Sequence, residues 1–412
     1  MSAPGGNVAE VHDSLTPETL ELRLADRALG DDGILAILRR LAVYRYHAHE
    51  GVELAFLNPT LGIDDAVAAY QCPYSADECA ALGVREMDLR NTRLTIPGMC
   101  YVFAYAALDA NLVSVDLSGN SMADWYRFLH PAEPALDEEG NPKAIQIPDE
   151  TQNIYTMMWN LAESHVAELR LDSVGMSAEV VDNLLKGLGT ALTNPVETLS
   201  LRGNRFGEDA VRAITASSGL KLISLELEGC GLSLAGMESI VRSFENNYSI
   251  CQLSLVNDYE EFEEGYDSED DASVSVQGDD PAYDSIRARC VALGNRNYEL
   301  RQRVGRALKR VITPARILLH PAATSPTPIA ALPPNVLDLV LKHTSGDPGA
   351  LTSNQWASVL EHAHDRSSIL KAARRAAVVT RSPFGGVADD DRAFEDWRRT
   401  LGCAYWKKYA WE

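Results

Sequence analysis

The residues that come closest to a metal site are two histidine pairs. His47 and His49 are separated by one residue, as are His362 and His364, and Asp365 follows the second pair. Imidazole and carboxylate groups bind zinc, but neither pair has a third ligand at a familiar spacing such as HExxH. We therefore expect surface histidines on helices and predict no metal site.

Motifs for nucleophilic catalysis and for nucleotide binding do not occur in the sequence. It contains no GxSxG, GxGxxG or GxxxxGK(S/T) stretch, and its seven cysteines include no CxxC pair. Cys230 and Cys251 fit structural places in the repeats described below. Carboxylate pairs are too common in so acidic a chain to identify a site. We predict no catalytic residue and no cofactor.

Composition and charge limit the classes of partner and compartment. The 412 residues are 46% hydrophobic, and 59 acidic residues against 37 basic ones give a formal net charge of −22. This charge repels nucleic acids and anionic membranes, so the expected partner is a protein with a basic surface. The dispersed cysteines and the lack of a leader sequence or a long apolar run predict a soluble protein of the cytoplasm or nucleus.

A repeat of about 28 residues organises a little under two thirds of the chain. In Val196–Ile214 the first, fourth, sixth and eleventh places are apolar, the ninth is Asn204, and apolar residues at helical spacing follow. The same frame predicts eight repeats, with sixth-place residues Leu24, Phe56, Leu89, Leu117, Leu171, Leu201, Leu227 and Leu255. The first two repeats fit least well. The spacing of 54 residues between Leu117 and Leu171 indicates one repeat plus an insertion.

Each repeat is predicted to fold as a strand, a turn and a helix. Apolar residues at the fourth and sixth places suit a short strand, and strands of successive repeats would stack as a parallel sheet. An amide at the ninth place, as in Asn120 and Asn204, can satisfy backbone groups left open at the turn, and Cys230 is a small substitute. The segments that follow have helix-start residues and helical apolar spacing.

From about Leu20 to Val256 the sequence resembles leucine-rich-repeat proteins of the ribonuclease-inhibitor-like type. The resemblance implies an α/β solenoid with parallel strands on the concave face and helices on the convex face, joined here to a small C-terminal helical appendage. The family includes inhibitors, Ran GTPase-activating proteins, substrate receptors of ubiquitin ligases and scaffolds. The fold therefore does not choose among these functions.

In this fold the third, fifth and seventh places of each repeat are expected to point from the concave face into solvent. The charged residues at these places are Glu21, Glu53, Glu86, Asp88, Asp116, Glu168, Asp172, Glu226 and Glu228, with Arg23, Arg90, Arg170 and Arg202. An ordinary hydrophilic face or a recognition surface would give this pattern. We assign partner binding to the set on consecutive strands, which is Asp88, Arg90, Asp116, Glu168, Arg170, Asp172, Arg202, Glu226 and Glu228.

Charge and proline content divide the chain into regions. The regions that we predict are a flexible tail (1–16), the solenoid (17–257) with a rim insertion at about 124–151, an acidic disordered loop (258–284), a basic capping helix region (285–321), a proline-rich linker (322–334) and a helical, aromatic-rich appendage (335–412). The insertion is either functional or inert. The appendage either docks on the repeats or binds a partner.

The basic region reverses the charge of the loop before it. Asp258–Asp280 has eleven acidic residues and no Lys or Arg, whereas nine Lys or Arg residues between Ser285 and Arg316 are opposed only by Glu299. We expect a helix that caps the solenoid end, and the alternative is a basic patch for RNA or an acidic protein. The apolar side chains expected on the solenoid end are Val304, Leu308, Val311 and Ile312.

The start of the appendage resembles an F-box, a helical module that binds a cullin-ligase adaptor. The matching stretch, Leu332–Leu341, begins Leu-Pro-Pro and continues with apolar residues at helical spacing. The resemblance implies adaptor contacts by Leu332, Pro333, Leu337 and Leu341. An F-box usually precedes its repeats, whereas this stretch follows them.

The sequence thus favours a non-enzymatic recognition or scaffold protein that binds a partner on the concave face. A substrate receptor of a ubiquitin ligase is one form of this function. The alternative is a GTPase-activating protein for a Ran-like small GTPase, since that family also combines these repeats with an acidic segment. In that family the acidic run is a tail, whereas about 130 residues follow it here.

Overall fold

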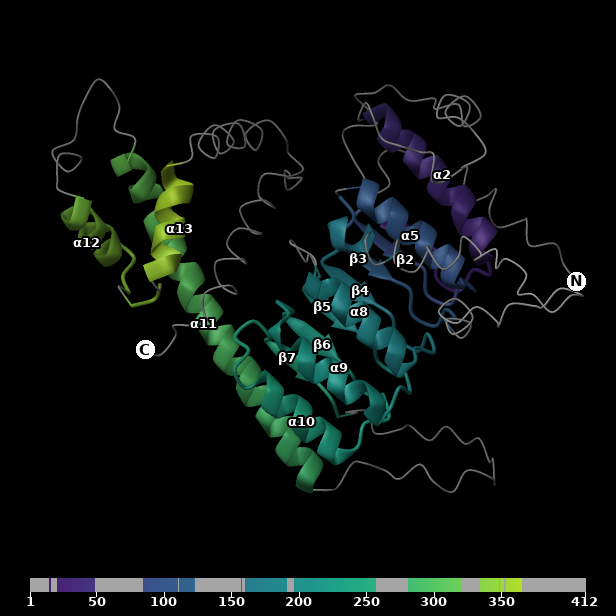
Figure 1. Cartoon of the computed structure of the whole chain (residues 1–412). Helices are drawn as coiled ribbons and strands as arrows, with labels where there is room; N and C mark the ends of the chain where they lie inside the picture. Colours follow the sequence, from purple (N-terminus) through teal and green to yellow (C-terminus); the bar gives the residue numbers. More distant parts are fainter. Residues whose placement is uncertain are drawn as a thin grey trace, which may run out of the picture. The chain divides into compact units, whose positions relative to one another are not determined.

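The structure, a computed structural model, describes two compact units of the chain (Figure 1). The described residues are 15, 21–48, 84–109, 111–122, 157, 160–190, 196–256, 281–319, 334–347, 349–351 and 353–364. Unit 1 falls within Met1–Glu245 and Gln252–Val291, and unit 2 within Asn246–Cys251 and Ala292–Glu412. The regions predicted as tail, rim insertion, acidic loop, linker and aromatic C-terminus lie wholly or almost wholly outside the described residues.

Unit 1 contains a seven-stranded parallel sheet whose strands are paired in sequence order. The strands are β1 (Glu21–Arg23), β2 (Glu86–Asp88), β3 (Ser114–Asp116), β4 (Glu168–Arg170), β5 (Thr198–Ser200), β6 (Ser224–Glu226) and β7 (Gln252–Ser254). Their middle residues are all buried and lie in register across the sheet: Leu22, Met87, Val115, Leu169, Leu199, Leu225 and Leu253. The predicted α/β class is confirmed.

Helices alternate with these strands along the chain. They are α2 (Gly30–Ala48), α5 (Ile96–Leu108), α8 (Ala178–Thr190), α9 (Val211–Ala216) and α10 (Leu234–Phe244). Figure 1 shows α5, α8, α9 and α10 following one another in the same order as the strands. Helix α10 begins after Ser233, whose Oγ accepts a hydrogen bond from the N–H of Gly236 at 3.2 Å. The alternation is compatible with the predicted repeat solenoid.

The turn after each strand has a recurring backbone conformation. In six repeats the residue at the eighth place has a φ angle between 52° and 70°, the left-handed region that favours glycine. These residues are Asp26, Asn91, Gly119, Ser173, Gly203 and Gly229. The chain therefore leaves each of these strands in the same direction.

The buried amide of Asn204 connects two consecutive repeats. Its Oδ1 accepts hydrogen bonds from the N–H groups of Val174 and Met176, both at 3.1 Å. Its Nδ2 donates to the carbonyl oxygens of Leu171 and Leu201, at 2.7 and 2.9 Å. The predicted role of the ninth-place asparagine is confirmed.

Asn120 has the same role two repeats before Asn204, and Cys230 shows how a thiol at this place changes the hydrogen bonds. Asn120 bonds to four backbone groups, those of Leu89, Thr92, Leu94 and Leu117. The Cys230 thiol donates to the carbonyl oxygen of Leu201 at 3.1 Å. The N–H of Phe206, at the place equivalent to Met176, binds the carbonyl of Asn204 at 2.7 Å instead. At this place the Cys230 thiol thus supplies the hydrogen-bond donor that an asparagine Nδ2 would supply. A backbone carbonyl takes the place of the asparagine Oδ1 as the acceptor.

Two long stretches of sequence leave the order of the sheet intact. Val115 of β3 is in register with Leu169 of β4, on either side of the predicted insertion. β1 likewise pairs directly with β2, so the prediction of a strand between them, carrying Glu53, Leu54 and Phe56, is wrong as to sheet order. Those residues lie outside the described ones. Pro59 takes the ninth place of that repeat and offers neither an amide nor a backbone N–H.

Unit 2 has a helical core of its own. Helix α11 (Pro281–Leu319) begins in unit 1 and continues in unit 2, which also contains α12 (Pro334–Thr344) and α13 (Ser353–His364). Tyr248, just before β7, packs against a cluster that contains the four residues expected to cap the repeats. This cluster is formed by Val304, Leu308, Val311 and Ile312 with Leu341, Ala350, Leu351, Trp356, Val359 and Ala363. An apolar helix face fits any apolar neighbour, so the sequence pattern did not distinguish the two partners.

Within unit 2, α11 also packs closely against residues 246–251. The buried Nδ2 of Asn297 donates to the carbonyl oxygens of Asn247 and Ile250, at 3.0 and 2.7 Å. Gly294 lies against this segment, and a Cβ atom there would be 2.3 Å from the carbonyl oxygen of Cys251. Glycine at position 294 therefore permits the close approach.

Candidate protein-binding surface

The predicted partner-binding residues come together along the strands of unit 1. Asp88, Asp116, Arg170 and Glu226 are the last residues of β2, β3, β4 and β6. Register places Asp88 beside Asp116 and Asp116 beside Arg170, with Ser200 of β5 between Arg170 and Glu226. Neighbouring strands are about 4.8 Å apart, so these side chains are within interaction distance. We call the nine predicted residues the charged strand face.

At β2 and β3 one arginine pairs with two carboxylates. Arg90 donates to both carboxylate oxygens of Asp88, at 2.9 and 2.8 Å, and its Nε lies 3.6 Å from Oδ2 of Asp116. These hydrogen bonds lower the pKa of Asp88 and raise that of Arg90. The other Asp116 oxygen accepts from the N–H of Ser118 at 3.0 Å.

At β4 the ion pair lies within a single strand. Arg170 donates through Nε and Nη2 to Oε1 of Glu168, at 2.9 and 2.7 Å, which raises the pKa of Arg170. Two residues further on, Asp172 accepts from the hydroxyl of Ser200 at 2.5 Å and from the N–H of Arg202 at 2.9 Å. Burial raises the pKa of Asp172 because the protein replaces water around its charge, and the two hydrogen bonds oppose that rise.

At β5 and β6 two glutamates share one arginine. Nε of Arg202 lies 3.1 Å from Oε2 of Glu226 and 3.2 Å from Oε2 of Glu228. Gln252 adds a hydrogen bond to Glu226 at 3.3 Å. Both glutamates are only 7% exposed, so the expectation that they point freely into solvent is wrong. They fold over Arg202 because a shared guanidinium offsets part of the cost of removing two charges from water.

The charge balance of the face differs from a plain acidic surface. It has six carboxylates and three guanidiniums, and each guanidinium is paired within the face. The excess negative charge is therefore carried mainly by Asp116, Asp172 and the Glu226 and Glu228 pair. The neutral side chains of Ser118, Ser200 and Gln252 occupy the same repeat places. Charge alone did not identify them as part of this surface.

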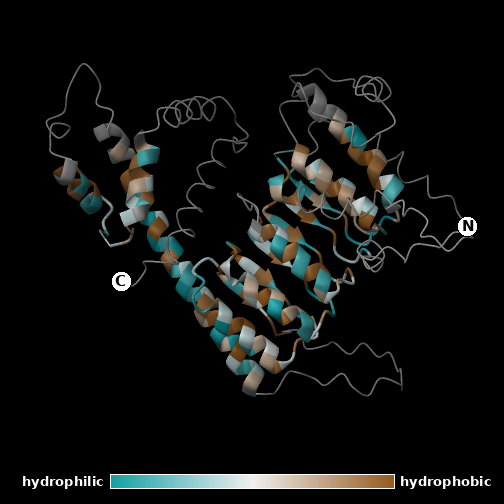
Figure 2. Ribbon diagram, in the orientation of Figure 1, coloured by the Kyte–Doolittle hydropathy of each residue, from teal (hydrophilic) through white to brown (hydrophobic). Residues whose placement is uncertain are grey.

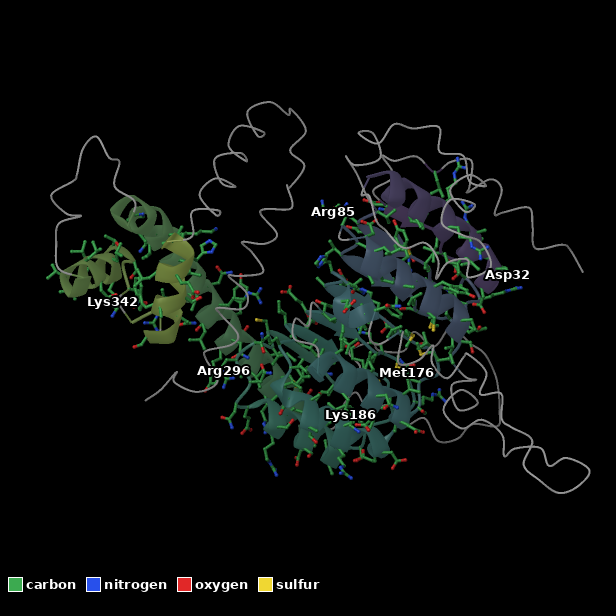
Figure 3. All side chains as sticks on the ribbon, turned by 45° about the horizontal axis from the view of Figure 1, so that its top comes forward. Asp32, Arg85, Met176, Lys186, Arg296 and Lys342 are labelled. Carbon is green, nitrogen blue, oxygen red and sulfur yellow. The ribbon has the colours of Figure 1, made fainter. Side chains whose placement is uncertain are left out.

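The predicted adaptor-binding residues are placed differently. Leu332 and Pro333 lie outside the described residues, Leu341 is fully buried in the unit 2 core, and Leu337 packs against that core. The exposed apolar side chains of α12 are Val336 and Leu339. Lys342 of the same helix (labelled in Figure 3) pairs with Asp338 at 2.8 Å. In this conformation Leu337 and Leu341 of α12 pack within unit 2.

The described residues also bear on the chemistry considered from the sequence. Among them, no group of three or more His, Cys, Asp or Glu side chains could hold a metal ion. Burial raises the pKa of the Cys100 and Cys230 thiols to about 12 and that of Cys290 to about 11, and it raises the pKa of Cys251 as well. These thiols stay protonated at neutral pH, which makes them poor nucleophiles.

In the described part of the chain, no helix combines the length and apolar character that a membrane span requires. No protein-family profile matches the chain, and a search of curated proteins finds no similar one.

Proposed function

We propose that the chain is a leucine-rich-repeat protein of the ribonuclease-inhibitor-like type and that it recognises another protein on the charged strand face. The repeat assignment is supported by parallel strands in sequence order, by the recurring turn and by the ninth-place contacts of Asn120 and Asn204. In this proposal the function is non-enzymatic recognition or scaffolding.

The observation that carries the proposal is the carboxylate excess across neighbouring strands. Asp116, Asp172, Glu226 and Glu228 lie on or directly after β3, β4 and β6, and one guanidinium serves the two glutamates. The remaining negative potential would attract Lys or Arg side chains of a partner, speed its approach and select against acidic proteins.

The test uses charge reversal where the side chains are reachable. Asp116→Lys with Glu168→Lys changes the face, and Asp209→Lys with Glu238→Lys makes the same change in net charge at exposed positions elsewhere in unit 1. Proteins captured from native extract are compared by quantitative mass spectrometry. Basic proteins retained by the wild type and the control, and lost with the face variant, support the proposal. Identical captures by all three forms would refute it.

Two finer assignments stay predictions. A role as a ubiquitin-ligase substrate receptor depends on an adaptor contact, whose predicted anchors Leu337 and Leu341 serve the unit 2 core. Activation of a Ran-like GTPase is tested directly by GTP turnover with the chain added.

A further inference from the structure

Helix α11 carries basic side chains in unit 2 that form no salt bridge with a described carboxylate, although the charge of Arg306 helps to lower the pKa of Asp347. Arg306 and Lys309 lie within ion-pair distance of no described carboxylate, and Arg310 reaches only the carbonyl oxygen of Ser345, at 3.5 Å. Their neighbour Arg303, by contrast, is held by Asp347 at 2.5 and 2.9 Å. In the described part of unit 2, the basic residue outside α11, Lys342, pairs with Asp338, so the basic side chains left without an ion pair lie on this helix.

The local charge of unit 2 is opposite to that of the whole chain. Its described residues contain eight Lys or Arg and four Asp or Glu side chains, a formal charge of +4 in a protein of −22. Seven of the eight basic residues lie on α11. Among the described residues of unit 2, the positive charge is therefore concentrated on α11.

Lys309 ends a stripe of residues along one side of the helix, and Arg306 and Arg310 lie beside it. Tyr298, Gln302, Gly305 and Lys309 follow one another at spacings of four, three and four residues, which places them on one helix face about 17 Å long. Tyr298 is 55% exposed, and no atom lies within 4 Å of the position that a Cβ atom of Gly305 would occupy. The side of α11 that faces away from this stripe contributes apolar residues to the buried cluster of unit 2. Hydrophilic and hydrophobic residues therefore alternate along the helix (Figure 2).

We propose that this surface, the α11 basic face (Tyr298, Gln302, Gly305, Arg306, Lys309 and Arg310), binds an acidic amphipathic helix of a partner protein. Carboxylates three and four residues apart on such a helix would meet Arg306, Lys309 and Arg310. The open surface at Gly305 admits a side chain of the partner, and Tyr298 supplies an aromatic contact at the other end. The partner has the opposite charge to the one proposed for the strand face.

A protein segment fits this face better than nucleic acid does. Three unpaired cations neutralise few phosphates, whereas nucleic-acid binding strength depends on the number of phosphates neutralised. The net charge of −22 also repels a long polyanion more than a short helix whose charges lie along one stripe.

The experiment measures the affinity of the full-length chain for a fluorescently labelled helical peptide, from the change in the fluorescence anisotropy of the peptide. The peptide consists of Ala, Leu and Glu, with the glutamates three and four residues apart. Arg306→Glu, Lys309→Glu and Arg310→Glu together should weaken binding by about tenfold or more. The matched control reverses three exposed basic residues of unit 1, namely Arg205, Arg212 and Lys221, which changes the net charge equally. Its affinity should stay within about twofold of wild type.

A milder pair of variants keeps the test valid if the triple variant melts early. Arg306→Gln with Lys309→Gln removes two charges that make no ion pair, and Tyr298→Ser removes the exposed ring, so both should fold and both should bind the peptide more weakly. Equal loss in the two triple variants, or no binding by wild type, would overturn the proposal. Tighter binding of an oligo-dT probe, lost in the same variants, would overturn it in favour of nucleic acid.

Discussion

The buried amide of Asn204 provides the sharpest test of the repeat frame. Asn204→Ala removes four hydrogen bonds of 3.1 Å or less, and a longer one to the carbonyl of Arg202, at a site with no solvent exposure. The carbonyl of Leu201 keeps the Cys230 thiol as a donor, but the N–H groups of Val174 and Met176 and the carbonyl of Leu171 lose the partner described above. We expect a large loss of stability because three buried polar groups are left unsatisfied.

The size of that loss follows from the number of groups. Each unsatisfied buried group costs about 1 to 3 kcal/mol, and entry of water favours the lower end, so the free energy of unfolding should fall by about 3 kcal/mol. In a unit of this size such a change lowers the melting temperature by about 6 to 12 °C. Thermal unfolding followed by circular dichroism measures it. The exposed Asn295→Ala serves as control and should leave the melting curve unchanged.

A second substitution at the same place separates the donor from the acceptor. Asn204→Cys should behave like Cys230 and keep one donor, to the carbonyl of Leu171, while losing both accepted bonds. Its stability should therefore exceed that of Asn204→Ala by about 1 kcal/mol. A melting curve for Asn204→Ala that coincides with wild type would refute the frame.

The remaining predictions concern unit 2. Gly294→Ala places a Cβ atom 2.3 Å from the carbonyl oxygen of Cys251 and should destabilise the chain by about 1 to 3 kcal/mol, measured by urea unfolding. Leu341→Ala opens a cavity at a fully buried position and should cost about 2 to 5 kcal/mol, by the same measurement. Hydrogen bonds from Arg303 lower the pKa of Asp347 below 3.8, so its stabilising effect is present above that pH and is lost as the pH falls through the lowered value. Asp347→Asn should therefore show a smaller loss of stability on acidification than wild type, with the two curves converging in strong acid.

Each of these predictions has a matched control. Gly305→Ala lies on the same helix with open space around it, so it should be neutral or stabilising, as expected for alanine in an exposed helix. Leu339→Ala removes an exposed leucine from the same helix as Leu341 and should change stability little. Equal destabilisation by the paired substitutions would contradict the packing of unit 2. Parallel pH profiles of wild type and Asp347→Asn would contradict the ion pair.

The strands and turns could be predicted because their signals are local. The positions of Leu117, Leu171 and Leu201, and the roles of Asn120 and Asn204, follow from the period and from the hydrogen-bonding capacity of an amide. The direct pairing of β1 with β2 could not be predicted. The first two predicted repeats both fit the frame poorly, and the pattern does not show which of them contributes a strand to the sheet.

The candidate site was predicted in part. Its residues do lie on neighbouring strands, because repeats in register bring the same places together. The burial of Glu226 and Glu228 against Arg202 could not be predicted. It depends on side-chain conformations and on contacts between neighbouring strands, which the spacing of residues in the sequence does not determine. The apolar face of α11 likewise fits more than one neighbour.

The registered pairing of β3 and β4 across the predicted insertion has a consequence for engineering and for divergence of the chain. Because the two strands meet as directly as strands joined by a short repeat, the number of residues between them does not set the geometry of the sheet. We therefore expect changes of chain length between residues 123 and 156 to leave the register of β3 and β4 unchanged, whereas Met157 is buried in the core.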